Sequence, residues 1–192
     1  MPNTSASGGY LSPLVATPPT EDIDLDSQFQ AAVAGITGID GQYVRPRWQS
    51  ALPKQPAAGV NWCAIGVTLI TPNDSPYINH VGAGEGSENY SRHEQIELSC
   101  TFYGTDSQRY AAMLRDGIAI PTNMSYLQQR GLFYIECSPI VSAPELFNQQ
   151  WIKRYDMTIS FRRQVSRTYG VLNILSADPI LVSDDIGIIS NS

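Results

Sequence analysis

The chain has 192 residues, of which 42% are hydrophobic and 16% are charged, and its formal net charge is −6 at pH 7. This length and composition predict one globular domain, and the acidic balance argues against a dedicated nucleic-acid binder, which should be basic overall. No apolar run approaches the ~18 residues that a membrane-spanning helix needs, so we expect no membrane partner.

The first 20 residues, MPNTSASGGYLSPLVATPPT, are rich in serine, glycine and proline. They lack the basic start and the continuous apolar stretch of a signal peptide. We interpret residues 1–20 as a flexible N-terminal arm, residues 21–176 as a single domain and residues 177–192 as a C-terminal tail. That tail mixes short apolar runs with acidic residues, and it could dock on its own domain or pair with a neighbour's sheet edge.

Apolar residues at helical spacing predict three helices. The first runs over about residues 24–34, with acidic residues at its start and glycines after its end. The second runs over residues 107–118, capped by Thr105 or Asp106, with an apolar stripe of Tyr110, Met113, Leu114 and Ile118. Pro121 ends it, and a short helix follows that Gly131 closes.

Strand patterns fill most of the remaining chain. Residues 43–48 predict an edge strand because Pro46 cannot donate to a central ladder, and the near-continuous apolar run over residues 60–71 predicts a strand covered on both faces. Residues 72–91 are turn-rich and predict a mobile hairpin tip or loop.

Three further segments complete the sheet. Residues 92–104 alternate strictly, with Ile96, Leu98, Cys100 and Phe102 facing the core; residues 132–142 and 150–169 predict two more strands. In the last of these, Tyr155, Met157, Ile159 and Phe161 lie opposite Arg154, Asp156, Thr158 and Arg162. We therefore predict an α+β fold: a largely antiparallel sheet of four to five strands, helices packed on one face, and extended N- and C-terminal arms.

The sequence gives little sign of catalytic chemistry. Cys63, Cys100 and Cys137 are widely spaced, which predicts buried thiols in a reducing compartment rather than disulfides or a zinc site. The glycine-rich GAGEGS from Gly82 is not followed by a helix pattern, so we expect a plain loop rather than a phosphate site. We expect no enzyme, no metal and no cofactor.

One enzymatic alternative stays open. His80 and His93 flank the glycine loop and could approach each other across a hairpin, where Glu94 or Glu97 would add a ligand. A small metal-binding hydrolase built around His80, His93 and Glu97 is therefore kept as an alternative. Solvated strand residues are the simpler interpretation.

Two basic and aromatic segments suggest a contact surface instead. Prolines stiffen the segment that contains Trp48, and ten arginines against two lysines favour fixed, planar contacts over general solubility. Arg162 and Arg163 are adjacent in a strand, so one should leave each face. The candidate subunit or neck contacts are Tyr43, Arg45, Arg47, Trp48, Arg162, Arg163, Arg167 and Tyr169. A solvated strand end is the competing interpretation of the second group.

Several blocks in one order resemble the neck, or tail terminator, proteins of tailed bacteriophages over about residues 8–178. These blocks are VRPRWQ, PKQPAAGVNWCAIGV, RHEQIELSCTFYG, LRDGIAIPTN, PELFNQQWIKRYDMTISFRR and RTYGVLNILSAD. The stretch after Pro179 has no counterpart in the resemblance.

The resemblance implies a structural virion protein of the head–tail neck, assembled in the host cytoplasm. Such a protein forms a ring, expected to be hexameric, that caps the tail tube, stops its polymerisation and joins the tail to the head connector, with DNA passing through the ring. Its implied partners are further copies of itself, the tail tube protein, a connector, stopper or collar protein, and the sheath if the tail is contractile. Two alternatives remain: a stopper or collar ring of the connector, and a monomeric adaptor that binds a peptide along a strand edge.

Overall fold

A computed structural model describes residues 3–14, 20–49, 54–57, 59–73, 75–147 and 149–173. These residues form three α-helices, α1 (Asp22–Thr37), α2 (Ser107–Ile118) and α3 (Pro121–Gln128), and a short 3-10 helix η1 (Gly41–Tyr43). They also form a large sheet with both antiparallel and parallel pairs. The fold is α+β, which confirms the predicted class.

The main sheet of the described residues has eight strands and the second sheet has two. The long strands are β3 (Trp62–Pro72), β5 (Ser87–Tyr103) and β10 (Arg154–Tyr169). The short ones are β1 (Pro13–Leu14), β2 (Val44–Pro46), β4 (Tyr77–Val81), β6 (Phe133–Cys137) and β7 (Val141–Ser142). The separate hairpin joins β8 (Glu145–Phe147) to β9 (Gln150–Ile152). The predicted count of four to five strands was too low. Strands of two or three residues are too short to show a period, and the five-residue β4 is exposed along most of its length and shows no alternation.

β5 lies at the centre of the sheet, between β10 on one side and β3 and β4 on the other, all antiparallel to it. β2 pairs with β3 in parallel and forms an edge, as its proline predicted. On the far side of β10, β6, β7 and β1 each pair with a different part of that strand. The long register between β5 and β10 runs unbroken from Arg154–Tyr103 to Tyr169–Glu88.

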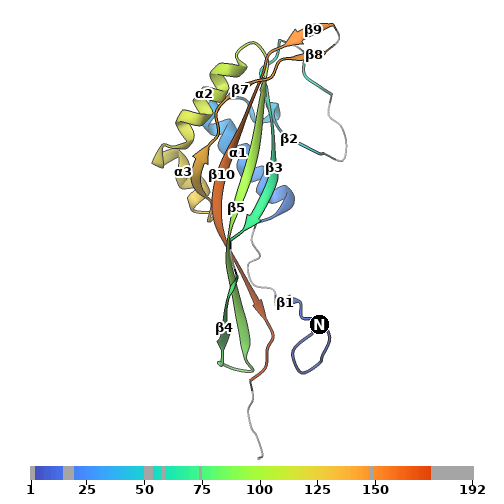
Figure 1. The fold of residues 1–192 in the computed structure, drawn as a ribbon, viewed down its shortest axis with the longest axis vertical. Coiled ribbons are helices and arrows are strands. Elements are labelled where there is room, and N and C mark those ends of the chain that lie inside the picture. The colour runs from blue at the N-terminus through green and yellow to red at the C-terminus, as the bar shows by residue number, and fades with distance from the viewer. Residues whose placement is uncertain are drawn as a thin grey trace, which may run out of the picture.

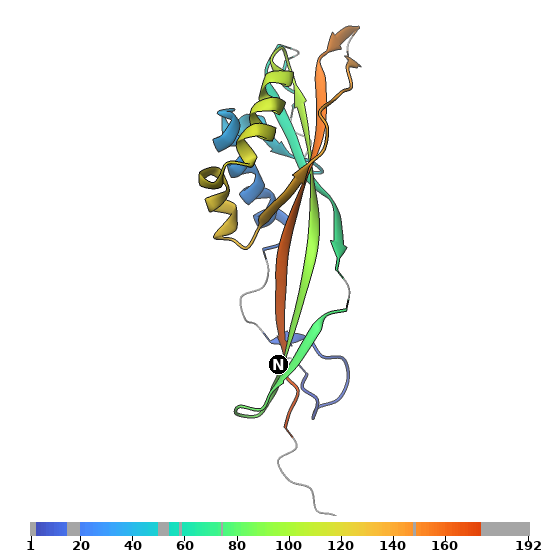
Figure 2. The same ribbon diagram turned by 60° about the vertical axis from the view of Figure 1, so that its left-hand side comes forward.

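The three helices lie on one face of the sheet, as predicted (Figure 2). Between them and the sheet is the core, where Ile96, Leu98, Cys100 and Phe102 are at most 1% exposed. Phe29 of α1 contacts Phe161 of β10 with ring centroids 5.0 Å apart. Burying one such side chain contributes roughly 1.5–3 kcal/mol relative to leaving it in water. The alternating pattern of residues 92–104 therefore identified the core face correctly.

The helix ends follow local chemistry. α1 extends beyond the predicted 24–34 and ends at Thr37; Gly38 caps it with a left-handed φ of 73°, and its N–H donates to the Ala34 carbonyl. α2 has the predicted bounds, but Met113 is 41% exposed and does not belong to the buried stripe. Asp106 stands at its N-cap, yet the Asp106 carboxylate accepts a hydrogen bond from the Asn61 side chain and none from its own helix.

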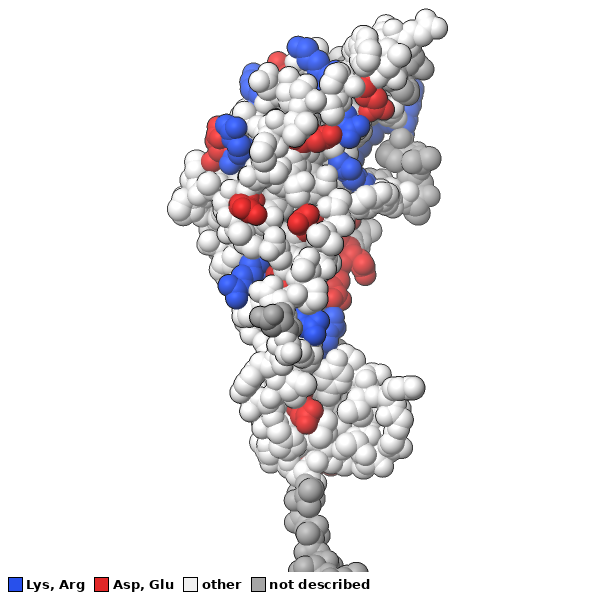
Figure 3. Space-filling view, viewed as in Figure 1, with Lys and Arg blue, Asp and Glu red and all other residues white. Residues whose placement is uncertain are grey.

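The lower half of the sheet extends away from the helices as a ribbon (Figure 1). It consists of β4, the first half of β5 and the last half of β10. Residues 72–91 were predicted as a hairpin tip or loop; they form a hairpin whose two arms are paired strands over Tyr77–Val81 and Ser87–Ser91. Figure 3 shows that this ribbon carries almost no charge on the face in view. The β3 strand was also predicted to be covered on both faces, but Leu69 and Ile70 are 49% and 46% exposed.

Residues 3–14 lie along the end of this ribbon. Pro13 pairs with Tyr169, and the Ser5 N–H donates to the Gly170 carbonyl over 3.0 Å. The Leu172 N–H donates in turn to the Ser5 hydroxyl over 2.8 Å. The predicted tail over residues 177–192 lies outside the described residues, and the division into an arm, one domain and a tail stays a prediction.

The cysteines are free thiols: Cys63 and Cys100 are buried and Cys137 is half-buried. Desolvation raises the pKa of the Cys63 thiol, and desolvation followed by the nearby Cys100 raises the pKa of Cys137 to about 11. Within the described residues, no helix combines the length and apolar character needed to cross a membrane.

Candidate contact surface

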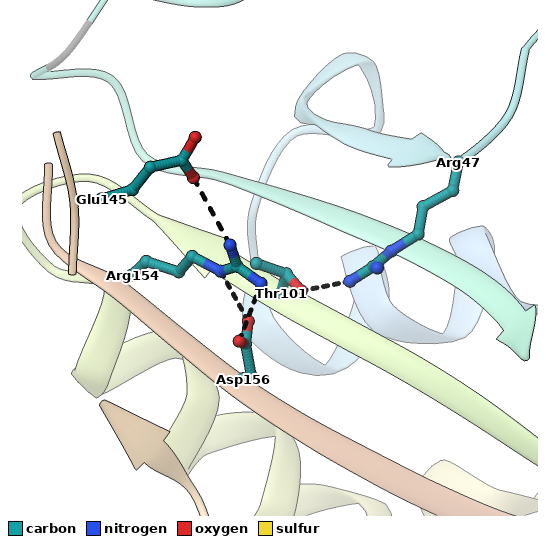
Figure 4. A network of polar contacts seen from close by, with 5 residues as sticks. All are labelled: Arg47, Thr101, Glu145, Arg154 and Asp156. Atoms are coloured by element: carbon teal, nitrogen blue, oxygen red, sulfur yellow. Dashed lines mark hydrogen bonds and ion pairs between the residues drawn. The ribbon is translucent and has the colours of Figure 1, made fainter. Parts of the chain in front are cut away.

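The segment after β2 crosses the face of the sheet that the helices leave free. Its backbone continues the pairing of β2, because the Arg47 N–H donates to the Ile65 carbonyl over 2.7 Å. The Arg47 side chain then reaches across β3 to donate to the Thr101 hydroxyl of β5 (Figure 4). The Arg47 Nε is buried and has no hydrogen-bond partner among the described residues. An unpartnered buried donor is costly, so this guanidinium is only partly satisfied inside the subunit.

The neighbouring candidates divide between the interior and the surface. Tyr43 packs against the core. The Arg45 guanidinium donates to the carbonyls of Gln42 and Lys54 over 3.1 Å and 2.8 Å, which fastens residue 54 beside β2. Arg45 therefore helps to hold the proline-rich segment in place.

Trp48 is the most exposed of the predicted contacts. It adopts a left-handed φ of 55°, and 73% of the residue is exposed. Its ring lies against Gly66 of β3, where an added Cβ would be only 2.8 Å from a ring carbon. Glycine at position 66 therefore leaves the space that the indole needs, and one side of the ring faces solvent. The stiff segment presents a tryptophan at the sheet edge.

Next to this segment, three residues form a row across the same face that the sequence did not identify as contacts. The Trp62 ring stacks on the Tyr103 ring at a centroid distance of 4.3 Å and an interplanar angle of 7°. The Arg154 guanidinium carbon lies 5.8 Å from the centroid of the Tyr103 ring. Desolvation by burial raises the pKa of the Tyr103 hydroxyl. These three residues are directly paired across β3, β5 and β10 and point to the same face. Sequence alone could not identify them as neighbours, because the register of the strands is not known from it.

Acidic side chains balance Arg154. Its guanidinium makes two hydrogen bonds to Asp156, of 3.0 Å and 2.9 Å, and a longer one of 3.4 Å to Glu145 (Figure 4). The hydrogen bonds that Arg154 donates to Asp156 raise the pKa of Arg154, so its charge is fixed. Between this row and the segment after β2 lies an open hollow of about 410 Å³, lined by Arg45, Arg47, Trp48, Trp62, Tyr103 and Glu145 among others.

The second predicted group begins with two arginines on opposite faces of β10, as expected. Arg163 is only 6% exposed, and its guanidinium donates to Glu94 and to the Thr20 carbonyl, each over 2.5 Å. This side chain connects the β5–β10 pair to the start of α1. Because the Arg163 side chain is buried and its hydrogen bonds are made within the subunit, we do not include it in the proposed contact surface.

Arg162, by contrast, points to the helix-free face. It is exposed, forms no ion pair within the described part of the chain, and lines a hollow of about 450 Å³ together with His93 and Tyr77. Arg167 makes a 2.9 Å ion pair with Glu21. Tyr169 meets Tyr90 edge-on at 6.5 Å. Arg162 is therefore the cation of this group that is most available to a partner.

The structure does not bring the two groups into one site. Arg162 pairs with Gln95, whereas Arg47 reaches Thr101, and six residues of strand correspond to about 20 Å. Of the second group, only Arg162 points to the helix-free face that the segment after β2 crosses, so this face carries two separate basic regions. Arg163, Arg167 and Tyr169 alternate onto the other face of β10, where Arg167 pairs with Glu21 at the start of α1.

Comparison with known protein families assigns this chain to a family. Residues 24–189 match the family described as phage neck terminator protein. The chain belongs to this family. The match confirms the resemblance seen in the sequence. A comparison with curated proteins gives no match.

The neck terminator match begins inside α1 and continues beyond the last described residue, so all eight predicted contact residues fall within it. This family consists of structural phage neck proteins, and the chain is accordingly a virion component. The surface described above belongs to a protein whose family associates with other neck and tail components.

The geometry also bears on the hydrolase alternative. His80 pairs with Glu88 across the β4–β5 hairpin, and His93 lies five residues further along β5, about 17 Å away. The two histidines, which the hydrolase alternative needs close together, are therefore far apart. His80 instead forms a 2.8 Å hydrogen bond with the Asn173 side chain. Within the described ranges, no group of three or more histidine, cysteine or acidic residues is placed to bind a metal ion.

Proposed function

We propose that this neck terminator protein forms a closed ring, expected to have six copies, on the head-proximal end of the tail tube. The ring stops further polymerisation of the tube and offers a docking surface to the head connector. The family match over residues 24–189 carries this proposal. The elongated subunit, with helices on one face and a free face on the other, supports it (Figure 2).

In this proposal DNA passes through the ring lumen during ejection. The net charge of −6 is compatible with that role, because carboxylates near the lumen repel the duplex and keep it from adhering. DNA passes through the ring without being bound as a ligand. The chain acts without catalysis, cofactor or metal.

The proposed protein partners are the tail tube protein on one side and a connector, stopper or collar protein on the other. A contractile tail adds the last sheath ring. Subunits assemble in the host cytoplasm and remain at the head–tail neck of the virion. For protein contacts we propose the accessible part of the predicted set, namely Arg45, Arg47, Trp48 and Arg162 on the helix-free face, and Arg167 and Tyr169 on the opposite face of β10.

The test uses tails assembled without this protein. We expect such tails to vary in length and to join no heads, and we expect purified full-length protein to bind one end of each tail and restore joining. Electron microscopy measures tail length, and native mass spectrometry of the bound complex counts the copies. Protein that binds isolated connectors but leaves tail ends open, in particular as twelve copies, would contradict the terminator role and favour a stopper or collar ring.

A further inference from the structure

Six of the exposed large apolar side chains lie at two opposite edges of the sheet, and others lie on β4, on the helices and on the β8–β9 hairpin. We name them the β3-edge row and the β6-edge row. The β3-edge row contains Trp48, Leu69 and Ile70, which are 73%, 49% and 46% exposed. The β6-edge row contains Phe133, Ile135 and Val141, which are 50%, 44% and 57% exposed. Large apolar side chains scattered singly need no explanation, but two grouped rows indicate surfaces that a partner covers.

The strand register places the two rows at the same level of the sheet. One line of paired residues runs through Leu69, Glu97, Ser160 and Glu136. The next line runs through Ile70, Ile96, Phe161 and Tyr134. Leu69 and Ile70 therefore lie at one end of these lines, and the neighbours of Phe133 and Ile135 lie at the other end.

The third member of each row continues the match. Trp48 lies against Gly66, on the line through Ser99 and Thr158. Val141 pairs with Asp156, two residues from Thr158 on the same strand. Along β10, the β3-edge row covers the level of Thr158 to Phe161 and the β6-edge row covers the level of Asp156 to Arg162, so the first stretch lies within the second.

Both edges lack a strand partner within the described residues. β3 is paired by β2 only as far as Ile65, and β6 pairs only with β10. Each edge is also interrupted by an irregularity in register, between Val67 and Leu69 on β3 and opposite Ser160–Phe161 on β6. A bulged edge does not extend a regular ladder, so these edges are suited to contact through side chains rather than through a continuous sheet.

We propose that the β3-edge row of one copy packs against the β6-edge row of the next copy around the ring, with the strands running along the ring axis. This inference rests on the proposed function. In a closed ring each interface joins two different patches, and pure rotation brings equal heights of neighbouring copies together. Two apolar rows on opposite edges, at one level of the sheet, meet both conditions.

The experiment compares capping of terminator-free tails by wild-type protein and by variants. Leu69→Asp places an acid in one row, and Phe133→Lys places a base in the other. Each single variant should cap at least about tenfold fewer tails, because a charge then faces an apolar patch in every interface. The double variant L69D/F133K should recover capping, since the acid of one copy then meets the base of the next. Ile120→Lys, at a residue that is 50% exposed between α2 and α3, is the matched control and should cap normally.

The outcomes separate this inference from the proposed function. Single variants that cap like wild type would overturn the interface and leave the terminator role standing. Wild-type protein that caps no tails would overturn the terminator role, and the interface with it. Both single variants are at exposed positions, and circular dichroism of each must match wild type for a loss of capping to support the interface. If a single variant fails to fold, recovery in the double variant still decides the question, and a folded double variant that does not cap would contradict it.

Discussion

Arg162 and Arg163 are neighbours in the chain, but β10 turns them to opposite faces and so gives them different roles. Arg163 is buried against Glu94, and the two side chains are 7% and 13% exposed. Arg162 faces solvent. Alternation in a strand predicts that the two point apart, but it does not say which one is buried. That depends on Glu94, 69 residues away in the sequence, and on Thr20.

Replacing Arg163 with alanine should lower the free energy of unfolding by roughly 3–5 kcal/mol, because Glu94 would be left buried without its partner. The double variant R163M/E94L should recover most of this loss, since it removes both charges. Urea unfolding monitored by circular dichroism measures the difference. Arg162→Ala is the matched control and should stay within about 0.5 kcal/mol of wild type. Equal effects at the two arginines would contradict the assignment.

Cys137 allows a second prediction from its environment. Burial raises its pKa to about 11, so the reactive thiolate forms only as the pH approaches that value. At pH 8 we expect iodoacetamide to modify Cys137 about 100-fold more slowly in the folded protein than in urea, where an ordinary thiol pKa applies. Mass spectrometry of the alkylated protein gives the rate. A rate profile for the folded protein that levels off near pH 9 would rule out the shift.

At the scale of elements, the sequence was most informative where one face is buried. The α2 helix and the alternating half of β5 were predicted well, because helices on one side impose a clear period on them. In the ribbon, the end of β10 was predicted as strand, but β4 and the first residues of β5 were predicted only as a hairpin tip or loop. Neither face of the ribbon meets a helix, so polar and apolar residues there follow no clear pattern (Figure 1). For the same reason the contact residues Trp62 and Tyr103 were not recognised, since their stacking depends on the pairing of two strands.

Asn173 stabilises the turn between β4 and β5 at the end of the ribbon. Its N–H donates to the Glu85 carbonyl, and its side-chain amide donates to the carbonyls of Gly82 and Gly84. Asn173→Ala should therefore speed hydrogen exchange several-fold in peptides that cover residues 77–91, with little change over residues 95–103. Hydrogen exchange with mass spectrometry checks this. Asn89→Ala, which removes one side-chain hydrogen bond with Thr168, should have a smaller effect. Equal exchange in both variants would argue against a special role for Asn173.

At the scale of the whole molecule, the exposed basic residues and the exposed apolar rows lie on different parts of the surface. The apolar rows lie at the two lateral edges of the sheet, whereas Arg162 and the basic segment around Arg47 lie on the helix-free face between them. In a ring built through its edges, that face remains available to the components above, below or inside the ring. The basic residues are then contacts to other neck components rather than to the next copy.

Charge reversal at Arg162 tests this division of roles. Arg162→Glu should leave ring formation and folding intact but lower the fraction of tails joined to heads at least about tenfold, because a like charge then faces the acidic group that we expect on the partner. Electron microscopy of heads and tails mixed with the variant measures joining, and native mass spectrometry counts the copies in the ring. Arg109→Glu makes the same change on α2, where the residue pairs with Asp106, and should join normally. A variant at Arg162 that forms no ring would instead place this residue at the interface between copies, and one that joins normally would remove it from the contact surface.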